Sequence, residues 1–325
     1  MASKVFSSRN LFKKFNVETL CTTDRVLDTL EVHHKLMTSG WPGQVLPTFR
    51  PDELVEIDSP AWPLSIKELD EKSGIQIKNF SDFINAIETR RAYFKDHGAV
   101  AADHGVETPF TCKLTSHEAD KLFQKRLIQL LSTDDAERFK GYMLYEMARM
   151  RVEDGLVMQL HAGSYRNHNA TVFEMFGSNL GFDIPVKVEW TRNLKPLLDA
   201  FGMDTRLRLI LFTLDESSYS RELAPIAGAY PTVKLGPPWW FLDSPNGMAR
   251  YFELVMETAG IENTVGFNDD SRNFFSIPAR HDLWRRMSAL WLAKLVHRGQ
   301  FDMQTAKSRM ADLAYRLVKR SYQLE

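Results

Sequence analysis

The stretch Val265-Gly266-Phe267-Asn268-Asp269-Asp270-Ser271-Arg272 is an apolar run that ends in acids, a hydroxyl and a base. If it forms a β-strand, side chains alternate between its faces, so Asp270 and Arg272 point one way and Asp269 and Ser271 the other. A carboxylate and a guanidinium at the carboxyl end of a strand can bind a metal, move a proton or hold an anionic substrate, and barrel enzymes place their active sites at that end. A structural ion pair is the alternative interpretation.

Six earlier segments have the same character, and they predict strands at residues 17–24, 44–50, 99–104, 157–163, 208–214 and 233–236. Helical patterns lie between and after them, at residues 26–37, 80–97, 194–201, 248–258, 281–296 and 304–322. The connections are long enough for parallel pairing. No glycine-rich phosphate loop follows the first strand, which argues against a doubly wound open sheet. We therefore predict an α/β fold, a (β/α)8 TIM-type barrel with seven of the eight strands in this chain.

The whole chain, residues 1–325, is expected to form one barrel domain that is incomplete at its amino-terminal side. The spacing between residues 105 and 154 is too long for a simple crossover, and helical runs at 121–131 and 139–150 indicate a helical insertion there. Insertions of this kind are tolerated in barrel loops. With 325 residues and 44% hydrophobic content, the chain can bury a full core.

Composition excludes several classes of partner. Lys and Arg number 41 against 42 Asp and Glu, and no basic cluster predicts binding to nucleic acid. The amino terminus lacks the apolar core of a signal peptide, and no apolar stretch is long enough to span a bilayer, so we expect a cytoplasmic protein with no membrane partner. The two cysteines, Cys21 and Cys112, are interpreted as buried thiols in a reducing compartment.

Cationic residues gather at the predicted strand ends. Arg50 ends the second strand, and the polar loop that contains Arg166 and His168 follows the fourth. Together with Arg272 these arginines predict an anionic substrate. His161 ends the fourth strand itself; a lone histidine after an apolar run is usually a satisfied core residue, but its polar company favours a site.

An aromatic pair follows the sixth predicted strand. Trp239 and Trp240 come directly after two prolines. They are either a hydrophobic plug or the wall of a sugar pocket, since an indole donates a hydrogen bond while its face stacks on C–H groups.

Taken together, six motifs resemble uronate isomerase, an outlying member of the amidohydrolase superfamily of metal-dependent barrels. They occur in the order found in that family over residues 7–322, and they are CTTD at 21–24, LPTFRPD at 46–52, DHG at 103–105, QLHAGSYRNHN at 159–169, GPPWWF at 236–241 and NDDSRNF at 268–274. No single motif is decisive, but six in order form a specific signal.

The resemblance implies an aldose–ketose isomerase of hexuronates, converting D-glucuronate to D-fructuronate and D-galacturonate to D-tagaturonate in bacterial hexuronate catabolism. It makes Asp270 a metal ligand and candidate base, and it places Arg272 and His161 at the catalytic centre. It assigns substrate binding to Arg50 and Arg166 and to the tryptophans Trp239 and Trp240. The implied cofactor is a divalent metal, with zinc as the first choice, and a homo-oligomer is left open.

The chain departs from the family pattern at one important point. The family's metal is also held by a His-x-His pair on the first strand, and no such pair occurs in these 325 residues. We therefore expect the chain alone to be inactive and to bind divalent metal weakly. The alternative functions are a metal-dependent hydrolase of the same superfamily and an inactive remnant that serves as an interaction unit.

Overall fold

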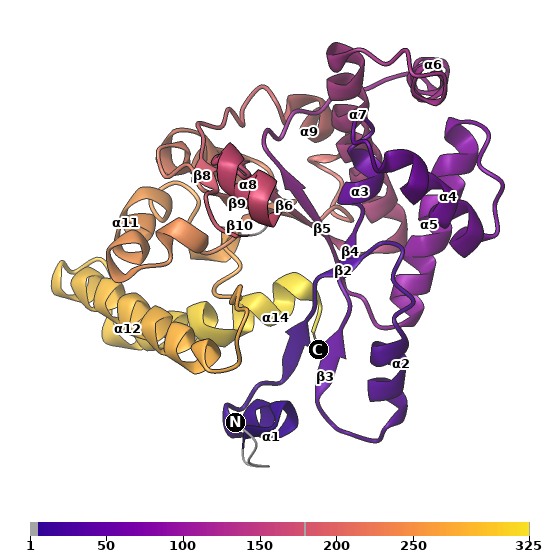
Figure 1. Cartoon of the computed structure of the whole chain (residues 1–325). Helices are drawn as coiled ribbons and strands as arrows, with labels where there is room; N and C mark the ends of the chain where they lie inside the picture. Colours follow the sequence, from indigo (N-terminus) through magenta and orange to yellow (C-terminus); the bar gives the residue numbers. More distant parts are fainter. Residues whose placement is uncertain (1–5, 179, 325) are drawn as a thin grey trace.

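A six-stranded parallel sheet forms the centre of the molecule in the computed structural model, which describes residues 6–178 and 180–324 (Figure 1). The strand order is β10-β9-β6-β5-β4-β2, and every pairing in it is parallel. The strands are β2 (Asp24–Arg25), β4 (Phe49–Arg50), β5 (Ala101–Val106), β6 (Val157–Ala162), β9 (Leu209–Thr213) and β10 (Val233–Leu235). The predicted parallel α/β architecture is confirmed.

The first two predicted strands are each divided into two short ones. β1 (Thr19–Cys21) pairs with β3 (Gln44–Leu46) in a separate two-stranded sheet, while β2 and β4 continue into the main sheet. Pro47 follows β3 and cannot donate to a strand ladder. Between the two sheets, hydrogen bonds to the Asp24 carboxylate hold the two chain segments together. Asp24 accepts from Thr22 Oγ1 at 2.7 Å and from the Thr48 N–H at 3.1 Å.

The stretch predicted as the seventh strand is not a regular strand, so this prediction is wrong in its detail. Thr264 makes an isolated parallel bridge with Leu235, and the Val265 N–H donates to the Leu235 carbonyl at 2.9 Å, but residues 265–270 have no regular structure. Gly266 explains the break, because its φ of +72° lies in the left-handed region. A Cβ at this position would also lie 2.8 Å from the Leu313 carbonyl oxygen. The segment therefore runs beside β10 without extending the sheet.

Helices surround the sheet, with α4, α5 and α7 toward the edge that carries β2 and β4 and α11 and α12 toward the edge that carries β10 (Figure 1). The helices are α1 (Ser8–Lys14), α2 (Glu31–Thr38), α3 (Asp52–Val55), α4 (Trp62–Ser73), α5 (Phe80–Asp96), α6 (Ser116–Leu127), α7 (Thr133–Asp154), α8 (Ala170–Phe176), α9 (Lys195–Phe201), α10 (Ala224–Ala229), α11 (Pro245–Val255), α12 (Ser276–His297), α13 (Met303–Ala311) and α14 (Leu317–Tyr322). None of the helices in the described part of the chain is long and apolar enough to cross a membrane.

Most predicted helices are present, and some details differ. The helical pair expected within residues 105–154 corresponds to α6 and α7. The last predicted helix is divided, since a π-helical turn at Asp312–Arg316 separates α13 from α14. A small antiparallel pair, β7 (Ser164–Tyr165) with β8 (Ile184–Pro185), lies in the polar loop after β6.

Hydrophobic side chains pack on both faces of the sheet. The larger core lies between the sheet and its helices and includes Phe49 and Leu160. The smaller core contains side chains from the opposite face of the strands and from the end of α14: Ala101, Val157, Ile210, Phe212, Val265 and Tyr322. The Tyr322 hydroxyl donates to Gln159 Oε1 at 2.6 Å, so the carboxyl-terminal helix is anchored to the centre of β6.

The interpretation of both cysteines as buried thiols is wrong. Cys21 is exposed and Cys112 is partly buried, and both are free. Cys21 is the last residue of β1, a strand whose pairing partner is β3 in a sheet of only two strands. Such a short sheet covers less of the side chain than the central sheet does.

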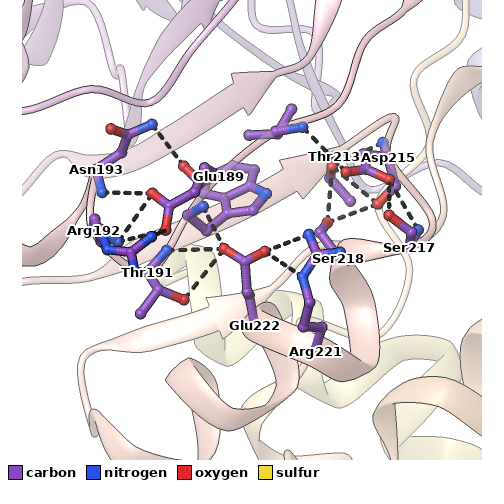
Figure 2. Close-up of polar contacts among 12 residues, drawn as sticks. Glu189, Thr191, Arg192, Asn193, Thr213, Asp215, Ser217, Ser218, Arg221 and Glu222 are labelled. Carbon is purple, nitrogen blue, oxygen red and sulfur yellow. Dashed lines mark hydrogen bonds and ion pairs between the residues drawn. The ribbon is translucent and has the colours of Figure 1, made fainter.

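A buried carboxylate ties the segment before α9 to the turn that follows β9 (Figure 2). Glu222 lies in a π-helical turn, Tyr219–Leu223, and its Oε2 accepts from the Trp190 N–H at 2.6 Å, the Thr191 N–H at 3.0 Å and the Thr191 hydroxyl at 3.2 Å. Its Oε1 accepts from Arg221 Nε at 2.7 Å. Burial raises the pKa of Glu222, but the two backbone donors and Arg221 outweigh burial and lower it. The Glu222 carboxyl is therefore ionised when it binds this segment.

Replacing Glu222 with glutamine should destabilise the fold. The charge-assisted hydrogen bonds are weakened and one acceptor oxygen is lost, so we expect the free energy of unfolding at neutral pH to fall by about 2 kcal/mol. Because the folded-state pKa is lowered, the contribution is present above the ordinary glutamate pKa and is lost as pH falls through the folded value. Urea unfolding should therefore show the parent and Glu222→Gln converging at acid pH.

The matched control is Glu137→Gln, which removes a carboxylate that is 48% exposed and pairs with Lys140 at 3.5 Å. Exposed pairs of this kind contribute less than about 1 kcal/mol. Equal losses in the two variants would show that the Glu222 contacts contribute no more than a surface ion pair.

Candidate active site

The register of β5 and β6 brings an acid and a histidine together on the inner face of the sheet. Asp103 is paired with Gln159, and Gly105 with His161. Because alternate residues share a face, Asp103, Gly105, Gln159 and His161 form one patch. His161 Nδ1 lies 2.6 Å from Asp103 Oδ1, and both side chains are largely buried. The strand pairing thus produces an Asp–His pair that is held from two neighbouring strands.

Asp103 is ionised, and this determines the state of the histidine. Burial raises the Asp103 pKa, but the charge and hydrogen bond of His161 and the charge of Arg50, whose Nε lies 3.4 Å from Asp103 Oδ2, outweigh burial and lower the pKa to about 2. An ionised carboxylate only accepts hydrogen bonds. His161 Nδ1 therefore carries a proton toward Asp103, which leaves Nε2 as the nitrogen that can exchange a proton with a substrate.

Arg50 connects this pair to a second carboxylate. Its Nη2 lies 3.1 Å from Asp52 Oδ2, and the Gly105 N–H donates to Asp52 Oδ1 at 3.3 Å. A side chain at Gly105 would crowd both groups, since a Cβ there would lie 3.1 Å from Arg50 Nη2. Burial and the charge of Asp103 raise the Asp52 pKa to about 6 despite the nearby Arg50. Asp52 therefore exchanges a proton close to neutral pH.

Aromatic rings surround His161 and lead to the acid of the opening motif. The imidazole stacks on Phe212 with 4.2 Å between ring centroids, and the Trp239 ring meets it edge-on at 4.7 Å. Trp239 Nε1 donates to Asp270 Oδ2 at 2.8 Å. Trp239 thus links Asp270 to His161, and the structure brings together three of the residues that the sequence singled out.

The two adjacent acids have different partners, although the segment is not the strand from which the alternation was predicted. Asp269 pairs with Arg280, which also pairs with Asp243 at 2.6 Å, so Asp269 is tied to the start of α12. Asp270 is exposed. Arg272 is exposed as well and is not among the residues that line the pocket described next, so its place at the catalytic centre stays a prediction.

An open pocket of about 350 Å³ adjoins this group at the carboxyl ends of β2 and β4. Its lining is strongly polar: Thr23, Asp24, Arg25, Arg50, Asp52, Glu53, Glu56, Gly105 and Arg166. Arg166 pairs with Asp183 at 3.3 Å, and its guanidinium lies 5.6 Å from the Trp240 ring centroid. Arg50 and Arg166, two of the three arginines predicted to face the substrate, therefore line one pocket. The Trp240 ring lies against the guanidinium of Arg166.

Sequence reasoning missed Asp52 and Asp103 as site residues. Both lie inside motifs quoted from the sequence, and the inward side of β5 was available from its alternation of small and polar residues. His104 is on the opposite face with Ala102 and is buried against the helices. Burial lowers the His104 pKa to about 3, so this imidazole stays neutral. His168, in the polar loop after β6, contacts the Tyr165 ring edge-on.

The described residues do not provide a complete metal site. Among residues 6–178 and 180–324, no group of three or more histidine, cysteine, aspartate or glutamate side chains could hold a metal ion. Asp270 is a single carboxylate with one oxygen bonded to Trp239, and His161 Nδ1 is committed to Asp103. A catalytic zinc ordinarily draws on three protein ligands. This donor set therefore does not fit a metal by itself.

A parallel α/β sheet with a polar pocket at the carboxyl ends of its strands defines an enzyme of the TIM-barrel class. A family model described as glucuronate isomerase matches residues 1–322. The uronate isomerase of Nostoc punctiforme is 53% identical over 325 residues, which are 100% of this chain and 69% of that protein. The chain belongs to the glucuronate isomerase family.

Solved structures agree with this assignment. The crystal structure of glucuronate isomerase from Caulobacter crescentus matches with a TM-score of 0.97 and 46% identity, over 100% of this chain and 68% of that one. A presumed metal-dependent hydrolase from Lactobacillus casei matches with a TM-score of 0.62 and 17% identity, over 97% of this chain and 76% of that one. The second likeness shows the fold alone, and it agrees with the predicted barrel fold.

The raised pKa of Asp52 can be tested directly. We expect difference infrared spectroscopy to detect a carboxyl group that is protonated at about pH 5 and ionised at about pH 7, because the folded-state pKa is about 6. This signal should be absent in Asp52→Asn. It should remain in Asp58→Asn, which removes a 48% exposed carboxylate that pairs with Lys140. An unchanged signal in Asp52→Asn would assign the titration to another group.

Proposed function

We propose that this chain acts on hexuronates as an aldose–ketose isomerase, converting D-glucuronate to D-fructuronate and D-galacturonate to D-tagaturonate. The observation that supports this most is the pairing of Asp103 with His161, which Trp239 links to Asp270. The adjoining pocket is lined by three arginines, Arg25, Arg50 and Arg166. The relatives named uronate isomerase and glucuronate isomerase support the same reaction.

The reaction requires a base that takes a proton from the carbon next to the carbonyl and returns it to the carbonyl carbon. It also requires a partner that moves a hydroxyl proton from one oxygen to the other, and a cation that holds the remote carboxylate. We assign the first role to Asp270, which is exposed and whose second oxygen is held by the Trp239 indole. His161 takes the second role through Nε2, because Asp103 fixes the proton on Nδ1. Arg166 is the proposed carboxylate clamp.

Arg50 has a different task in this proposal. Burial lowers its pKa, but the charges of Asp52, Asp103 and Asp270 outweigh burial and raise it, so Arg50 is permanently charged. Two of these acids contact it directly. We therefore propose that Arg50 keeps the acids ionised and adds positive potential for the substrate, while Trp239 and Trp240 form the sugar-facing wall. The substrate role expected for Arg272 stays a prediction.

Zinc stays the proposed metal, with Asp270 as the residue that would bind it; no step above depends on a metal. The proposed substrate is a small sugar acid, and a cytoplasmic location and a homo-oligomer remain predictions.

A hydrolase is the second candidate function, and its structural support is the fold likeness to the Lactobacillus casei protein. Product analysis separates the two, because an isomerase yields a ketouronate and a hydrolase does not.

In a form extended upstream by a strand that carries a His-x-His pair, Asp270→Asn should lower the turnover of D-glucuronate by about 100-fold or more, because an amide cannot act as the base. The measurement is the formation of D-fructuronate followed by NMR, with and without added zinc. The fold should be unchanged, since Asp270 is exposed. Asp282→Asn, which breaks an exposed ion pair on α12, is the matched control and should keep the parent rate.

Turnover in Asp270→Asn within a few-fold of the parent would rule out the base assignment. Turnover of neither protein, with glucuronate still bound, would favour the inactive remnant.

The clamp assignment predicts selective binding of uronates. We expect saturation-transfer NMR to detect D-glucuronate on this chain in preference to D-glucose, because only the uronate offers a carboxylate to a guanidinium. Arg166→Gln should weaken glucuronate binding by about tenfold or more and leave the weak glucose signal unchanged. Arg192→Gln removes an arginine that is 89% exposed and should change neither. Equal binding of the two sugars by the parent would show that no clamp operates.

A further inference from the structure

A second arginine-lined pocket lies at the amino ends of β6 and β9, opposite the end that carries the candidate active site. It has a volume of about 320 Å³. Its lining comes from the end of α7, from the loop before β9 and from the carboxyl-terminal end of the described chain: Arg151, Val152, Glu153, Asp154, Gly155, Thr205, Arg206, Arg208 and Gln323. None of the proposed isomerase residues takes part in it.

Arg151 is the unusual residue of this pocket. Only 3% of it is exposed, and its buried Nε has no hydrogen-bond partner. None of the hydrogen bonds or ion pairs among the described residues comes from its guanidinium, and Asp154 acts on it through its charge alone. A charged group that is partly removed from water without an ion-pair partner favours the binding of an anion on its open side.

The acids that line the pocket are already engaged. Asp154 pairs with Arg91, through Nε at 2.5 Å and Nη2 at 3.1 Å. Glu153 pairs with Arg149 at 2.7 Å.

Of the three arginines that line the pocket, Arg206 has a carboxylate partner. Its Nη2 lies 2.7 Å from Asp204 Oδ2. Arg208 donates to the Arg320 carbonyl at 2.9 Å and, through Nε and Nη2, to Gln323 Oε1 at 3.2 and 3.3 Å, so its acceptors among the described residues are neutral. Burial and the charge of Arg208 outweigh the charge of Asp154 and lower the pKa of Arg151 to about 10. The pocket therefore retains two guanidinium groups, Arg151 and Arg208, without an ion pair among the described residues.

We propose that this pocket binds a phosphate-type oxyanion between Arg151 and Arg208, either free phosphate or the phosphate group of a phosphomonoester. Guanidinium groups match the tetrahedral oxygens of phosphate with paired N–H donors. The pocket volume exceeds that of the ion, so an ester group has room beside it. The site lies away from the proposed catalytic residues and is independent of the proposed reaction.

The test is calorimetric titration of the whole chain with inorganic phosphate and with glycerol 3-phosphate, against sodium chloride at matched ionic strength. We expect saturable binding of a phosphate species and a rise in melting temperature that chloride does not produce. Binding should weaken by about tenfold or more in Arg151→Met and in Arg208→Gln. Tighter binding of glycerol 3-phosphate supports an ester ligand, and tighter binding of phosphate supports the free ion.

Two further variants localise the effect. Arg286→Gln removes an exposed arginine of α12 that pairs with Asp282, and it should bind as the parent does. Arg166→Gln tests the other pocket, and it too should retain phosphate binding. No saturable binding by the parent would overturn the proposal, as would binding that is lost in Arg166→Gln and kept in Arg208→Gln. If Arg151→Met does not fold, Arg208→Gln decides, because Arg208 is only partly buried.

Discussion

The site depends on one buried anion, the carboxylate of Asp103. An unpaired carboxylate at this depth would take up a proton, and His161 and Arg50 prevent this from two neighbouring strands. The arrangement requires the register of β5 against β6, because a slip by one residue would turn Asp103 outward and His104 inward. The register of β5 against β6 therefore also determines that Asp103 is ionised and that His161 carries its proton on Nδ1.

The sequence was sufficient for the order of the elements and for side chains that follow strand ends, such as Arg50 and His161. It was not sufficient for pairings between strands, because the contact of Asp103 with His161 depends on a register that no local pattern contains. The break at Gly266 was hidden for another reason: its backbone has a positive φ and passes so close to the distant Leu313 carbonyl that a Cβ would lie 2.8 Å from that oxygen. Tertiary contacts of this kind override local strand preference.

The arginines at the two ends of the sheet differ in whether they have carboxylate partners. At the carboxyl end, Arg50 is matched by Asp52 and Asp103, so its charge organises neighbouring acids rather than attracting a ligand on its own. At the amino end, Arg151 is buried with no such match. The same residue type thus has opposite consequences, and the difference lies in the number of carboxylates within contact distance.

The last segment of the sheet shows how a carboxylate is positioned without a strand ladder. The bridge to β10 is made by Thr264, and residues 265–270 have no regular structure, so side chains must hold them. Phe267 stacks on Trp284 with 5.1 Å between centroids, and Asp269 is bound to Arg280. These two contacts fix the segment against α12. Asp270 then needs only the Trp239 hydrogen bond to be oriented, and its exposure is preserved. The adjacent acids therefore have different roles. The Asp269 side chain is largely buried in its ion pair with Arg280 and anchors the backbone, whereas Asp270 stays exposed to solvent, as proton transfer requires.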